Sequence, residues 1–120
     1  MFVFDEDYHF EWPVKVVMPG VPPIEAEFTA RFRLVEEDEL FARQRLAGEI
    51  TADLASLLRS ERAALAQRLV GWSGIATPDG AELPYSEEAR DRLLRQRPIR
   101  EAVSQAYFDA VLRGGLAEKN

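Results

Sequence analysis

Alternation of apolar and polar side chains between residues 10 and 34 constrains the fold more than any other feature of the sequence. Every even-numbered residue from Ile24 to Leu34 is apolar, and every odd-numbered residue between them is charged or threonine. Residues 10–16 follow the same rule more loosely, with Glu11 and Lys15 between apolar residues. Because successive side chains of a β-strand point to opposite faces, this period of two predicts two half-buried strands.

The segment that joins these strands, Met18–Pro23, contains three prolines. Proline has no backbone N–H and cannot continue a hydrogen-bonded ladder. We therefore predict an antiparallel β-hairpin over residues 10–34, preceded by a loose lead-in at residues 1–9. Trp12, Phe28 and Phe32 lie on one face of the hairpin, as candidate structural anchors. A two-stranded hairpin alone is marginally stable, so this face must be covered.

Two interpretations of the hairpin remain open. In the first, the aromatic face forms a core with helices of the same chain. In the second, the outer edges of the hairpin also pair with a neighbouring protomer, because exposed strand edges are templates for further pairing. Pro13 fits an edge strand, where it would blunt such pairing locally.

Residues 36–112 are predicted to be mainly helical, in four segments. These are 36–50, 51–70 with Thr51 as N-cap, a short helix after the N-cap Ser86, and a last helix from Pro98 to about 112. Proline disfavours α geometry in the preceding residue but suits a first helical turn. Residues 113–120 form a tail. The predicted class is α+β, as a single domain of 120 residues with a hairpin and about four helices.

A run of turn residues interrupts the helical region at 71–85. Gly71 and Gly74 flank Trp72, and Pro78-Asp79-Gly80 predicts a tight turn between two extended arms. Trp72 and Tyr85 lie on opposite arms, so we expect them to pack together. Both are candidate structural anchors, and Trp72 is interpreted as a core residue rather than a partner-binding one.

Charged residues interrupt the apolar stripe of the helix predicted at 51–70. At about 100° per residue, Glu61 and Arg68 lie in the same arc as the leucines. Either both side chains reach the edge of a shallow groove, or this face meets a second subunit and the two residues pair across the contact. The candidate interface residues are Leu54, Leu58, Glu61, Leu65 and Arg68.

Composition excludes several classes of function. A formal net charge of −6 argues against nucleic acid as a partner, and the absence of cysteine excludes disulfides and thiolate metal sites. No run approaches the roughly 20 apolar residues of a membrane span, and the start MFVFDEDYHF lacks the features of a signal peptide. We expect a cytoplasmic protein without a membrane partner.

Catalytic motifs are absent from the sequence. It has no phosphate-binding glycine loop, no nucleophile elbow and no zinc-binding helix motif. His9 is the single histidine, and the acidic residues near it match no cation-binding loop. We expect no enzymatic activity, no cofactor and no metal.

Several motifs occur in a fixed order over nearly the whole chain. The most specific are the region from Gly71-Trp72 to Glu88 and the final Glu118-Lys119-Asn120, and the others are residues 10–14, Phe28–Phe32, Asp79-Gly80 and Ala106–Phe108. Together these motifs resemble the tail assembly chaperones of long-tailed bacteriophages and prophages.

This resemblance implies a non-catalytic protein of the bacterial host cytoplasm that binds the tape measure protein and keeps it soluble during tail tube assembly. It also implies a homo-oligomer. In many such phages a ribosomal frameshift near the end of the gene gives a longer form that recruits tail tube protein. Glu118-Lys119-Asn120 can be encoded by GAA AAA AAC, a run on which a ribosome can slip, although a simple charged tail explains the residues equally well.

Two other classes of function stay open beside the chaperone. One is a different phage or mobile-element interaction module, such as a connector or an inhibitor. The other is a small enzyme that uses carboxylate chemistry, with carboxylates brought together from distant positions.

Overall fold

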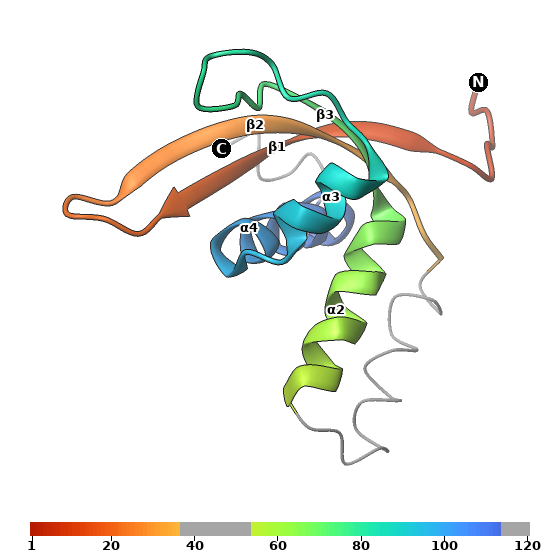
Figure 1. The fold of residues 1–120 in the computed structure, drawn as a ribbon. Coiled ribbons are helices and arrows are strands. Elements are labelled where there is room, and N and C mark those ends of the chain that lie inside the picture. Colours follow the sequence, from red (N-terminus) through yellow and green to blue (C-terminus); the bar gives the residue numbers. More distant parts are fainter. Residues whose placement is uncertain (37–53, 114–120) are drawn as a thin grey trace.

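The computed structural model describes residues 1–36 and 54–113, in which helices cover one face of an antiparallel sheet (Figure 1). The sheet contains β1 (His9–Met18), β2 (Ile24–Arg33) and β3 (Leu69–Ser73), with β2 in the centre. The helices are α2 (Leu54–Arg68), α3 (Glu87–Leu94) and α4 (Arg97–Phe108), and a π-helical turn, η1 (Asp109–Arg113), continues α4. The predicted α+β class with an N-terminal hairpin is confirmed.

The register of the hairpin explains which residues form the core. Phe10 lies opposite Phe32, Trp12 opposite Ala30, and Val14 opposite Phe28. Directly opposed residues of an antiparallel pair share a face, so the alternating apolar residues of both strands project to one side. There α4 packs against β1, and α2 contacts β2 and β3. The buried sheet residues are Val14, Val16, Phe28, Ala30, Phe32 and Leu69.

A third strand covers one of the two outer edges of the hairpin, the edge formed by β2. β3 pairs with β2 over Thr29–Phe32. The helix predicted to reach Val70 instead ends at Arg68, and Leu69 already pairs with Phe32. Leu69 is completely buried, and we attribute the early change from helix to strand to this packing, which outweighs local helix propensity.

The close approach of β3 to β2 depends on a glycine. A Cβ atom on Gly71 would lie 3.3 Å from the Cβ of Arg31, its partner in the ladder, which is tighter than ordinary van der Waals contact. A shift in register between Arg31 and Phe32 leaves Val70 as an extra residue on β3, which is a β-bulge.

The boundaries of α3 and α4 follow the predicted signals. The Ser86 hydroxyl accepts a hydrogen bond of 3.0 Å from the backbone N–H of Ala89, so the predicted N-cap is confirmed. Pro98 lies in the first turn of α4. Three of the four predicted helices thus match α2, α3 and α4. The fourth, predicted at 36–50, falls outside the described residues apart from Glu36, as does Thr51.

Candidate partner-binding groove

Trp72 and Tyr85 pack together as predicted, and their polar atoms hold the chain between β3 and α3 in place. The two rings meet edge to face with centroids 4.8 Å apart. The indole N–H of Trp72 donates to the carbonyl of Leu83 at 2.9 Å, and the Tyr85 hydroxyl donates to the carbonyl of Leu69 at 2.9 Å. Both predicted anchors are therefore half-buried parts of a clasp that ties residues 83–85 to the start of β3.

The turn between the two arms is stabilised by its own side chains. The Thr77 hydroxyl donates to the carboxylate of Asp79, which also accepts from the backbone N–H of Ala81. The hydrogen bond from Thr77 has the larger effect and that from Ala81 the smaller, and together they hold the pKa of Asp79 below its ordinary value of 3.8. Gly80 has a φ of +88°, the left-handed region that favours glycine. The predicted turn is thus confirmed. The two arms that it joins meet in an isolated antiparallel β-bridge between Ala76 and Glu82.

Both tryptophans belong to one row across the sheet. Trp12 and Trp72 lie opposite Ala30 from β1 and β3, so all three side chains share the helix-facing side. The small methyl group of Ala30 leaves room for an indole on each side. Phe28 and Phe32, the remaining predicted anchors, are buried in the same layer. Four of the five anchors therefore lie in the core or pack against it, and the fifth, Tyr85, packs on Trp72.

Tyr107 is a central core residue that was not among the predicted anchors. It is completely buried, and its ring meets Phe32 edge to face at 5.3 Å. Its hydroxyl accepts a hydrogen bond from the backbone N–H of Val35 at 3.1 Å, which ties the end of the hairpin to α4. The helical spacing of Val103, Ala106 and Tyr107 indicates that they share the buried face of a helix. The sequence does not indicate that Tyr107 contacts the hairpin.

The candidate interface on α2 is divided between the interior and the surface. Leu65 is buried, Leu58 is half-buried and Leu54 is exposed. Arg68 is 6% exposed, and its guanidinium carbon lies 5.0 Å from the centre of the Tyr107 ring. Leu54 and Glu61 are the two exposed members of this set.

Glu61 lies near Arg100 rather than Arg68. Its carboxylate is 3.7 Å from the Nε atom of Arg100, which is 5% exposed. The apolar residues Ile99, Val103 and Tyr107 recur at helical spacing, and this pattern predicts that Arg100 lies opposite them and faces solvent. The prediction is wrong, because Arg100 is buried. Its guanidinium donates to the carbonyl of Leu94, the last residue of α3, at 3.1 Å, so Arg100 links α2, the end of α3 and α4.

Arg90 makes a second link near the clasp. It donates to the Tyr85 hydroxyl at 3.4 Å and to the carboxylate of Asp91 at 3.1 Å. Burial alone would lower the pKa of Arg90, but the hydrogen bonds to Tyr85 and Asp91 outweigh it and raise the pKa. Arg90 therefore stays positively charged while it donates to the Tyr85 hydroxyl.

An open hollow separates the tip of the hairpin from α4, and we call it the tip groove. Its volume is about 700 Å³. Apolar side chains line much of it from both sides, among them Val17 and Met18 of β1, Pro23 of the loop, and Pro98 and Ala102 of α4. Val17 is 53% exposed, and the neighbouring Val21 and Ile24 also face solvent. The tip groove thus combines an apolar lining with exposed apolar residues at its rim.

Three charged residues line the tip groove, Lys15 of β1 and Arg97 and Glu101 of α4. Arg97 and Glu101 on α4 form an ion pair of 2.7 Å, and the hydrogen bond to Glu101 raises the pKa of Arg97. Across the groove, Lys15 lies opposite Glu27 in the ladder and shares a neighbouring hollow with Glu25. The tip groove itself is thus lined by two cations and one carboxylate, and two further carboxylates, those of Glu25 and Glu27, line the neighbouring hollow.

Groups that could hold a metal ion do not occur among residues 1–36 and 54–113, where no three His, Asp or Glu side chains converge. No helix in the same residues is long and apolar enough to span a membrane. Comparison of the chain with models of known families, with curated proteins and with solved structures gave no match.

Proposed function

We propose that this protein is a tail assembly chaperone, which binds an amphipathic helical segment of a tape measure protein in the tip groove. The main observation in support of this proposal is the exposed apolar surface that β1, the hairpin loop and α4 contribute to one open groove. Large exposed apolar patches mark sites of protein association. A groove with apolar walls from two elements suits the apolar stripe of a helix, with anchors at i, i+3 and i+7.

The motifs that resemble the chaperone family support this proposal through their structural roles. Residues 10–14 and Phe28–Phe32 pair as neighbouring strands, and Gly71-Trp72 with Pro84-Tyr85-Ser86 forms the clasp and the cap of α3. Such residues would keep the sheet and helices in the arrangement that opens the tip groove.

The wider assignment rests on the same resemblance. The protein would act in the bacterial host cytoplasm, associate with copies of itself, and have a frameshifted longer form that recruits tail tube protein. Its predicted helix at 36–50 would add a fourth helix to the fold. The codons of Glu118-Lys119-Asn120 test the frameshift directly, because codons that interrupt the run of adenines would remove the slippery site.

Coexpression with the tape measure protein of the same gene neighbourhood tests the proposal. The full chain is expected to bring the tape measure protein into the soluble fraction and to copurify with it. Val17→Glu/Pro23→Glu adds a carboxylate at each of two exposed residues that line the tip groove, so the fold is spared. We expect the amount of tape measure protein that copurifies with this variant to fall at least about tenfold, because burying an unpaired charge costs several kcal/mol.

Leu112→Glu provides a matched control. Leu112 is an exposed apolar residue of η1 that does not line the tip groove, so this variant should bind like the natural protein. Normal binding by Val17→Glu/Pro23→Glu would refute the groove as the binding site. Failure of the unmodified chain to bind any segment of the tape measure protein would refute the function itself.

A further inference from the structure

Residues 1–7 of the chain present an unusual surface. Met1, Phe2, Val3 and Phe4 are each at least 73% exposed, and Asp5, Glu6 and Asp7 follow directly. The segment is attached to the fold at Tyr8, whose carbonyl accepts a hydrogen bond from the N–H of Leu34. In Figure 1 it leaves the sheet at the end opposite the hairpin tip. Two phenyl rings and three carboxylates are therefore exposed on one short segment, in which the Asp7 carboxylate also lies 3.3 Å from the Nε2 atom of His9.

A pocket between α2 and α3 has the complementary chemistry. Its volume is about 160 Å³, and it is lined by Ala63 and Ala66 of α2, Leu94 of α3, Arg62, Asp91 and Arg95. We call it the arginine pocket. An apolar cavity of about 150 Å³ in another protein holds a benzene molecule, so this volume suits one phenyl ring. The alanine and leucine side chains supply apolar contacts for that ring.

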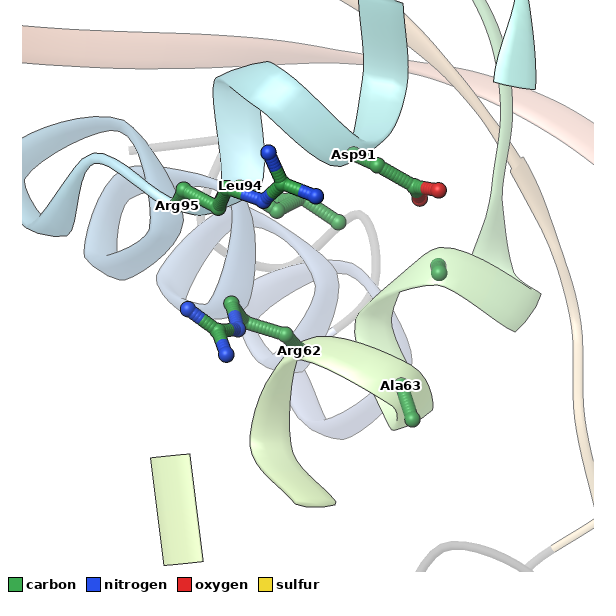
Figure 2. A pocket seen from close by; sticks show the side chains of 6 residues that line it. Arg62, Ala63, Asp91, Leu94 and Arg95 are labelled. Carbon is green, nitrogen blue, oxygen red and sulfur yellow. The ribbon is translucent and has the colours of Figure 1, made fainter. Parts of the chain in front are cut away.

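Two cations at the arginine pocket are available to a ligand. In Figure 2 the guanidinium groups of Arg62 and Arg95 lie on one side of the pocket, and the carboxylate of Asp91 points to the other side. Asp91 is already paired with Arg90 at 3.1 Å. Within the described residues, neither Arg62 nor Arg95 has a side-chain hydrogen bond or ion pair. In a chain of net charge −6, this pair is a local positive site.

We propose that residues 1–7 of one copy of this chain dock into the arginine pocket of a second copy. A phenyl ring of the segment fills the pocket, where it meets aliphatic side chains and guanidinium groups. The carboxylates that follow it pair with Arg62 and Arg95, since charge-assisted hydrogen bonds to arginine are short and directional. The local attraction opposes the general repulsion between two acidic chains.

The proposed contact joins different surfaces of the two copies. One copy supplies the segment and the other supplies the pocket, so the interface is heterologous and can propagate from copy to copy. This property separates it from a symmetric contact, in which the same patch faces itself. It is also independent of what the tip groove binds.

A complementation experiment with the full chain tests the proposal. The segment variant, Phe2→Ser/Phe4→Ser, keeps the pocket, whereas the pocket variant, Arg62→Glu/Arg95→Glu, keeps the segment. The unmodified chain should associate in a concentration-dependent way in analytical ultracentrifugation. Each variant alone should be monomeric, with an association constant at least about tenfold lower. An equimolar mixture should form a 1:1 heterodimer and no larger species.

The matched control is Arg92→Glu, which reverses an arginine on α3 that does not line the pocket and should associate like the unmodified chain. Circular dichroism and the melting temperature establish that each variant is folded. The proposal is overturned if the unmodified chain is monomeric at all concentrations, if either variant associates normally, or if the mixture remains monomeric.

Discussion

At the scale of single residues, Trp72 connects the sheet to the chain that follows it. Its ring lies in the row with Ala30 and Trp12, contacts Tyr85, and donates to the carbonyl of Leu83. An indole can fill both roles because its ring is apolar and its N–H is a donor. Phenylalanine would retain the ring contact but leave the Leu83 carbonyl without this donor.

Trp72→Ala is therefore expected to lower the free energy of unfolding by about 3–5 kcal/mol, the usual cost of truncating a packed aromatic residue. Trp72→Phe should cost about 1–2 kcal/mol, mainly through the lost hydrogen bond. Urea unfolding followed by circular dichroism measures both values. If Trp72→Ala kept its stability but lost self-association, Trp72 would be a partner-binding residue and not a core anchor.

At the scale of elements, Arg100 of α4 connects α4 to α2 and α3 through two contacts of unequal strength. Its hydrogen bond to the carbonyl of Leu94 is buried and lies at the end of α3. Its approach to Glu61 of α2 is longer, at 3.7 Å, and the Glu61 side chain is 44% exposed. Ion pairs that solvent reaches contribute little, whereas a buried hydrogen bond to a charged group contributes more.

Arg100→Leu should therefore destabilise the protein by about 1–3 kcal/mol, because the Leu94 carbonyl loses its buried donor. Glu61→Gln should cost less than about 1 kcal/mol, since the exposed carboxylate is the weaker partner. Thermal unfolding of the two variants beside the unmodified chain gives the comparison. An equal or larger loss for Glu61→Gln would mean that the ion pair, and not the hydrogen bond, holds α2 to α4.

Elements set by local rules could be predicted from the sequence, and elements set by distant partners could not. The alternation at 24–34, the Ser86 cap and the turn at Gly80 each depend on residues a few positions apart. β3 forms because Leu69 is buried opposite Phe32, and Arg100 is buried where it binds the carbonyl at the end of α3. The tip groove likewise exists because α4 packs beside β1, so its lining residues carried no local signal.

At the scale of the whole molecule, the sheet is unevenly supported along its length. The segment Thr29–Phe32 pairs with strands on both sides, and its side chains Ala30 and Phe32 are buried. The segment Ile24–Glu27 pairs with β1 alone and is exposed. The tip groove is thus at the less stable end of the hairpin. Binding surfaces that adapt to a partner are commonly drawn from such regions.

Amide hydrogen exchange should follow this gradient. The amides of Thr29–Phe32 should exchange only through global unfolding, because their opening requires separation from both neighbouring strands. Those of Ile24–Glu27 should exchange through local opening of the tip, at rates at least about tenfold higher. Added tape measure segment should slow exchange around Val17 and Ala102, which line opposite walls of the tip groove. Equal protection along the whole of β2 in the free protein would show instead that the hairpin opens as one unit with the core.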